Sequence, residues 1–192
     1  MQRDGEVGNS AEINARNLNR LIFVDVESEG GGSVNTGRMT EFGAVTVAGI
    51  AFHGIIKEDH PSSTMTKWRD PIMLGDGGEI TESEGPLSYV MMKFDRWLEI
   101  HKTFFHADYL VFVSDNPAFD WQWINDAFWT TLGRNPFGHS ARRIGDFYAG
   151  VVKNWNKASE WKRLRVTPHD HNPVHDATGN VEAFLRILGG ER

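Results

Sequence analysis

The chain has 192 residues, no cysteine and a formal net charge of −6. This length suffices for one domain with a proper core, and the lack of cysteine excludes disulfides and thiolate zinc sites and fits a reducing compartment. With 40% apolar and 24% charged residues, the composition is typical of a soluble globular protein. The polar start of the chain predicts no secretory signal, and no apolar run approaches the roughly 20 residues of a membrane span. We therefore expect a cytoplasmic protein without membrane contact.

The first part of the chain changes from a polar tail to strand patterns. Residues 1–18 show no apolar periodicity, so we expect a disordered tail before a single domain of residues 19–192. β-branched and aromatic residues then predict successive strands, the third antiparallel to the second, over residues 19–27, 40–50 and 51–57. Residues 58–84 are rich in Pro, Ser, Gly and Asp and predict a long irregular segment.

The second part of the chain is mainly helical in pattern. Apolar residues three and four apart predict an amphipathic helix over residues 86–101. The remaining patterns predict a fourth strand over residues 107–113 and helices over residues 120–132, 140–160 and 173–188. Early strands followed by helices that alternate with one more strand predict an α/β fold, with a central mixed sheet flanked by helices.

The first strand ends in a pair of carboxylates. Asp25 and Glu27 are two residues apart, so both side chains point to one face of the strand. Two such charges repel unless a cation lies between them, and the glycines at 30–32 leave the space in front of them bare. The pair is therefore either a place where metal and phosphate meet or an exposed acidic strand end that favours solubility.

Two later segments carry the same kinds of side chain. Asn116-Pro117 marks a turn and Asp120 is expected to open a helix, either as a helix start signal or as a third carboxylate facing the pair. Residues 167–177 contain three histidines and two aspartates. Two histidines could pair with a metal ligand five residues later. His171 with Asp176 is favoured over His175 with position 180, because position 180 is an asparagine and offers a neutral amide instead of a carboxylate. Asn172-Pro173 then gives an N-cap followed by proline at the first helical position.

Together these motifs resemble the DEDDh 3′–5′ exonuclease superfamily, which includes proofreading exonucleases, RNase T and oligoribonuclease. The matching residues follow the family order: Asp25-x-Glu27, Asn116-x-x-Phe119-Asp120 and His171-x-x-x-x-Asp176. The strand starting Thr40-Glu41-Phe42-Gly43 is similar as well, whereas Ser28 stands where many members carry threonine. The resemblance implies an RNase H-like fold and hydrolysis of single-stranded nucleic acid from its 3′ end, with RNA slightly favoured over DNA and a nucleoside monophosphate as product.

The resemblance also implies roles for individual residues. Two divalent cations, Mg²⁺ or Mn²⁺, would be held by Asp25, Glu27, Asp120 and Asp176. His171 would be the general base. Ser28 and the backbone at Val26 would contact the terminal nucleotide, and Phe119 is either a stacking residue or part of the core. Since many members are dimers, a homodimer is one expected oligomeric state.

Several alternatives stay open at this point. The tryptophans at 68, 121, 123 and 129 either stack on bases or belong to the core. His169, His171 and His175 with Asp170 would offer a zinc site. Seven basic residues against two acidic ones either form a solvated surface or guide a phosphate backbone: Arg142, Arg143, Lys153, Lys157, Lys162, Arg163 and Arg165 against Asp146 and Glu160. A non-catalytic nucleic-acid-binding relative and a polymerase-associated proofreading subunit are the competing functions.

Overall fold

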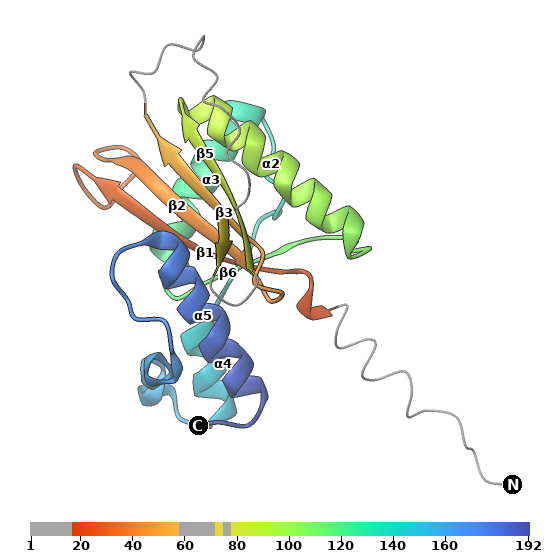
Figure 1. Ribbon diagram of the computed structural model, residues 1–192. Helices are drawn as coiled ribbons and strands as arrows, with labels where there is room; N and C mark the ends of the chain where they lie inside the picture. Colours follow the sequence, from red (N-terminus) through yellow and green to blue (C-terminus); the bar gives the residue numbers. More distant parts are fainter. Residues whose placement is uncertain (1–16, 58–71, 75–77) are drawn as a thin grey trace, which may run out of the picture.

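A mixed sheet with helices on both faces forms the protein (Figure 1). The computed structural model describes residues 17–57, 72–74 and 78–192. The strand order is β4-β5-β3-β2-β1-β6-β7. The strands are β1 (Leu21–Glu29), β2 (Arg38–Thr46), β3 (Ala51–Ile56), β4 (Ile72–Leu74), β5 (Gly78–Gly85), β6 (Val111–Ser114) and β7 (Ala141–Arg143).

The pairing directions identify the RNase H-like arrangement. Strands β1, β2 and β3 form an antiparallel meander, and β6 and β7 extend it in parallel on the β1 side. On the β3 side, β5 pairs in parallel with β3, and β4 pairs antiparallel with β5. The predicted fold class, with a central mixed sheet flanked by helices, is therefore confirmed.

Strand β1 alternates between the two hydrophobic cores. Ile22, Val24 and Val26 pack with the helices α2 (Leu87–Phe104) and α3 (Pro117–Leu132) on one face of the sheet. Phe23 packs on the other face with α4 (Ile144–Val151), α5 (Pro173–Leu188) and the 3-10 helix η2 (Glu160–Leu164). Side chains alternate along a strand, so Asp25 and Glu27 lie on the α5 face, as Phe23 does.

Several predicted boundaries were wrong. The segment 58–84 was expected to be irregular, yet it contains β4 and most of β5; residues 58–71 and 75–77 lie outside the described part. Strand β2 ends at Thr46 and β6 begins only at Val111. The single helix expected over 140–160 is instead β7, α4, η1 (Trp155–Lys157) and the start of η2. The edge strand β7 is three residues long, and its pairing with β6 leaves no local pattern in the sequence.

Other local predictions were close to the structure. Helix α5 begins after Asn172, whose side chain accepts hydrogen bonds from the backbone N–H groups of Val174 and His175. Helix α3 begins at Pro117, three residues before the expected start at Asp120. Sixteen of the eighteen residues of the expected N-terminal tail lie outside the described part. None of the described helices is long and apolar enough to cross a bilayer.

Candidate active site

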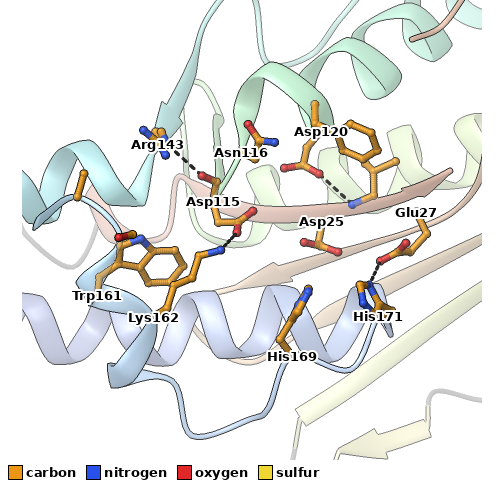
Figure 2. Close-up of a pocket in the computed structure, with 14 residues that line it drawn as sticks. Asp25, Glu27, Asp115, Asn116, Asp120, Arg143, Trp161, Lys162, His169 and His171 are labelled. Carbon is orange, nitrogen blue, oxygen red and sulfur yellow. Dashed lines mark hydrogen bonds and ion pairs between the residues drawn. The ribbon is translucent and has the colours of Figure 1, made fainter. Parts of the chain in front are cut away.

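The site lies at the carboxyl ends of two neighbouring parallel strands inside the sheet, β1 and β6. Because β1 and β6 run in the same direction, the end of β1 with Asp25 and Glu27 lies beside the turn that follows β6. That turn, Asp115-Asn116, leads directly into α3, whose first turn carries Asp120. The Val26 N–H donates to Oδ1 of Asp120 at 3.2 Å, which fixes this third carboxylate against the strand (Figure 2).

A glycine brings the fourth carboxylate to the same place. Gly43 on β2 is the cross-strand partner of Asp25, and a Cβ there would lie 2.3 Å from the backbone oxygen of Pro173. The start of α5 therefore packs directly on the sheet beside Asp25. Asp176, in the first turn of α5, is completely buried there.

Burial and mutual repulsion set the protonation of the carboxylates. Burial, followed by the charges of Asp120 and Asp176, raises the pKa of Asp25 to about 9. Burial also raises the pKa of Asp120 to about 7. Without a cation, the pocket thus holds protons near neutral pH, as expected for carboxylates gathered in a desolvated site.

The donor set suits hard divalent cations. Carboxylate oxygens of Asp25, Glu27 and Asp176 all lie within 4.8 Å of one another. Oδ2 of Asp120 is buried and has no hydrogen-bond partner among the described residues. An all-oxygen set of this kind is what Mg²⁺ and Mn²⁺ prefer, so the residues present fit such a cation.

The two histidines before α5 occupy different positions. Nδ1 of His171 lies 3.5 Å from Oε1 of Glu27, and its side chain is 75% exposed at the edge of the pocket. The His171 backbone has φ 63°, an uncommon conformation for a residue other than glycine. Nδ1 of His169 lies 2.6 Å from Oδ2 of the buried Asp176. The centroids of the two rings are 4.6 Å apart, and each imidazole contacts a different carboxylate of the cluster.

The histidine grouping predicted for zinc is only partly present. His169, His171 and Asp176 offer ligand atoms within 4.8 Å of one another. His175 instead contacts Asp170, with 2.9 Å between Nδ1 and Oδ2. The four residues proposed for zinc therefore separate into two pairs of different environment.

The loop that carries these histidines is anchored on α5. Glu182 accepts hydrogen bonds from the backbone N–H groups of Val166 at 2.8 Å and Thr167 at 2.7 Å, and from the Thr167 hydroxyl at 2.8 Å. At Gly179 a Cβ would lie 2.8 Å from the Thr167 backbone oxygen. The close approach of loop and helix fixes where the histidine segment starts.

Of the three residues expected to contact the substrate, two line the pocket and one does not. Val26 and Phe119 line a pocket of about 490 Å³ together with Asp25, Glu27, Asp120 and His171. Phe119 is also half-buried against the core of α2 and α3, so both of its predicted roles remain compatible with its position. Ser28 follows an irregularity in the β1–β2 pairing and is not among the described residues that line the pocket.

The tryptophans that were expected either to stack on bases or to belong to the core differ in their exposure. Trp123 is buried in the core, whereas Trp129 is exposed. Trp121 is half-buried against the core, and Trp68 lies outside the described residues. None of the described tryptophans at 121, 123 and 129 lines the pocket.

The pocket has a second wall, in which Asn116 alone belongs to the three motifs singled out in the sequence. It is built from residues that follow β6, end β7, connect η1 to η2 and lie in η2. These are Asp115, Asn116, Arg143, Ala158, Ser159, Trp161 and Lys162, and His169 lines the pocket as well. The signal in the sequence was the basic excess between Arg142 and Arg165, which does not show which of its residues face the carboxylates.

Comparison with known proteins gives one informative match. No protein-family model matches the chain. Part of the chain is 37% identical over 103 residues to the 3′–5′ DNA exonuclease Cap18 of Escherichia coli, a match covering 50% of this chain and 54% of that relative. The chain thus spans about half the length of the curated relative it matches.

Proposed function

We propose that the chain is a divalent-metal-dependent 3′–5′ exonuclease of the DEDDh type that acts on single-stranded nucleic acid. The observation that carries this proposal is that Asp25, Glu27, Asp120 and His171 line one pocket. The buried Asp176 has a carboxylate oxygen within 4.8 Å of those of Asp25 and Glu27. These residues come from β1, α3, α5 and the loop before α5, and they are the ones that resemble the family motifs. The match to a relative with 3′–5′ DNA exonuclease activity supports the same reaction.

The chain's own residues divide the work of the proposed reaction. Asp25, Glu27 and Asp176 would hold one cation, and the buried Oδ2 of Asp120 would help to hold a second. When bound, such a pair of cations activates the attacking water and stabilises the leaving 3′ oxygen. His171 would accept the proton of that water, since its exposed imidazole lies at the edge of the carboxylate cluster.

The contact of His169 with Asp176 makes it a positioning residue in this proposal. With Nδ1 2.6 Å from Oδ2, the imidazole of His169 would orient the buried carboxylate of Asp176, as outer partners of metal ligands commonly do. His171 makes no such close contact with Asp176; it lies beside Glu27 and lines the pocket, where it can face the water. The two neighbouring histidines would therefore have different roles.

DNA is the substrate to test first. The sequence alone slightly favoured RNA, but the name of the relative refers to DNA. Val26 lines the pocket while its N–H is engaged by Asp120, so a contact of Val26 with the 2′-hydroxyl that distinguishes RNA from DNA would use its backbone oxygen.

The test uses 5′-labelled single-stranded DNA and RNA oligonucleotides with Mg²⁺, Mn²⁺ or EDTA. We expect a cation-dependent ladder that shortens from the 3′ end, and its loss in Asp120→Asn. Asp126→Asn is the matched control, because Asp126 is an exposed carboxylate on the same helix. Retention of uncut oligonucleotide under every condition would favour the non-catalytic binding function. Activity that depends on an added polymerase would favour the proofreading subunit.

A further inference from the structure

The second wall of the pocket carries positive charge opposite the carboxylates. Arg143, at the end of β7, and Lys162, in η2, line the same pocket as Asp25 and Glu27. In Figure 2 the Lys162 ammonium points toward Asp115, which belongs to the same wall. Apart from its histidines, Arg143 and Lys162 are the cationic side chains among the described residues that line the pocket.

The backbone that presents Lys162 is held firmly. Trp161 is 1% exposed and belongs to the core beneath α5. At Gly145, in the first turn of α4, a Cβ would lie 2.5 Å from the Ala158 backbone oxygen, so the segment packs closely on that helix. Arg163 donates to the hydroxyl of the buried Tyr148 at 3.2 Å. These contacts fix the position of the Lys162 backbone relative to the carboxylates.

Asp115 organises the charges of this wall. Its Oδ2 lies 2.9 Å from Nζ of Lys162 and 3.7 Å from a guanidinium nitrogen of Arg165. Its backbone oxygen accepts a hydrogen bond from Nε of Arg143 at 3.2 Å. Because the more deeply buried Arg165 also pairs with Asp115, Lys162 is the partner that can turn away to another anion while Asp115 keeps a counter-charge.

A nucleic-acid strand bound for the proposed reaction would bring a second phosphate into the pocket, and this phosphate needs a positively charged partner. In the proposed reaction, the 3′-terminal phosphodiester lies at the carboxylate wall, where cations balance its charge. The next phosphate on the 5′ side has no such cations and would be repelled by Asp25, Glu27 and Asp120 if it lay near them. Within the pocket, the groups able to balance its charge are Arg143 and Lys162.

We propose that Lys162 and Arg143 form a phosphate-binding subsite for the phosphodiester on the 5′ side of the scissile bond, with Asp115 holding Lys162 in place until a strand binds. This inference rests on the proposed function. It implies that the protein prefers oligonucleotides over substrates with a single phosphate. It also assigns a function to part of the basic excess in residues 142–165.

The test compares an oligonucleotide with a substrate that has one phosphate. Lys162→Gln removes one charge from a side chain that is 55% exposed, so little packing is lost. Lys157→Gln is the matched control, because Lys157 lies in the neighbouring η1 and pairs with Glu160 outside the pocket. The measurements are kcat/KM for a single-stranded oligonucleotide and for thymidine 5′-monophosphate p-nitrophenyl ester.

Lys162→Gln is expected to raise KM for the oligonucleotide about tenfold, because it removes one charge-assisted contact to a phosphate. It should lower kcat/KM for the oligonucleotide far more than kcat/KM for the nitrophenyl ester. The slope of log kcat/KM against log salt concentration should fall by about 0.7, the value for one phosphate contact on a single strand. Lys162→Arg should restore most of the oligonucleotide activity, and Lys157→Gln should behave as the wild type. Equal losses on both substrates, or none on the oligonucleotide, would overturn the subsite.

Failure of the proposed function would be recognised separately. If the wild-type chain cleaves neither substrate, fluorescence anisotropy with a labelled oligonucleotide in EDTA still measures binding by the same variants. About tenfold weaker binding by Lys162→Gln than by Lys157→Gln would then support the phosphate subsite without the nuclease. Equal binding by the two variants would refute the subsite.

Discussion

Replacing Asp25 by asparagine should stabilise the protein in the absence of divalent cations, and increasingly so as the pH rises. In the folded protein, burial and the neighbouring Asp120 and Asp176 raise the pKa of Asp25 from 3.8 to about 9. In the unfolded chain the carboxyl group loses its proton near its ordinary pKa of about 4. Between these values the folded state holds one more proton, so the free energy of unfolding falls as the pH rises. The amide of the asparagine variant would have no such titration.

The size of the effect follows from the width of that pH window. Each pH unit is worth about 1.4 kcal/mol, so the four units between pH 4 and pH 8 set a ceiling of about 5 kcal/mol. Relaxation and water entry reduce the penalty of a buried charge, and we expect a gain of about 2 to 3 kcal/mol for Asp25→Asn at pH 8. For a chain of this size, that gain corresponds to a rise in Tm of about 4–12 °C.

Thermal unfolding in EDTA at intervals from pH 4.5 to pH 8.5 measures this directly. The wild type and Asp25→Asn should differ little at the lowest pH and diverge steadily above it. Asp126→Asn, at an exposed position of α3, should follow the wild type. A constant difference between Asp25→Asn and the wild type across the range would refute the reasoning, as would a wild type that is the more stable of the two at pH 8.

Four further substitutions and one control test how the pocket is built. Gly43→Ala would place a Cβ 2.3 Å from the Pro173 oxygen, and we expect it to lower the free energy of unfolding by about 2–4 kcal/mol and to weaken Mn²⁺ binding measured by calorimetry. Gly32→Ala is the control and should change neither quantity, because a Cβ there meets no atom within 4 Å. His171→Ala should lower kcat about 10²- to 10⁴-fold and His169→Ala about tenfold; the opposite order in single-turnover assays would exchange their roles. Phe119→Leu should keep the Tm within about 3 °C but raise KM if the ring stacks on a base; an unchanged KM would assign Phe119 to the core.

The parts of the fold that could be predicted are those with local signals. Helix α5 begins where Asn172 and Pro173 place it, because an N-cap and a proline at the first helical position act within a few residues. The alternation of Asp25 and Glu27 with apolar residues fixed which carboxylates share a face. Asp176 can approach Asp25 because Gly43 has no side chain in the way. The sequence does not show that Gly43 lies opposite Asp25, since this depends on the register between β1 and β2.

The second wall shows what could not be predicted. Lys162 in η2 meets Asp115 in the turn after β6, and these two segments are far apart in the sequence. No spacing or periodicity links the two residues, and the sequence left open whether the basic segment forms a solvated surface or guides a phosphate backbone. Strand β5 was missed for a related reason: it pairs in parallel with β3, and its carboxylates and glycines are typical of a loop.

The most direct test of the central claim follows the first product released from a strand labelled at its 3′-terminal nucleotide. With Mg²⁺ or Mn²⁺, the account predicts that all early label is released as nucleoside 5′-monophosphate. Circular single-stranded DNA should stay intact, and Asp120→Asn should release no label while Asp126→Asn should match the wild type. Early label in longer fragments, cleavage of the circle or full activity of Asp120→Asn would contradict a 3′–5′ exonuclease built on this pocket.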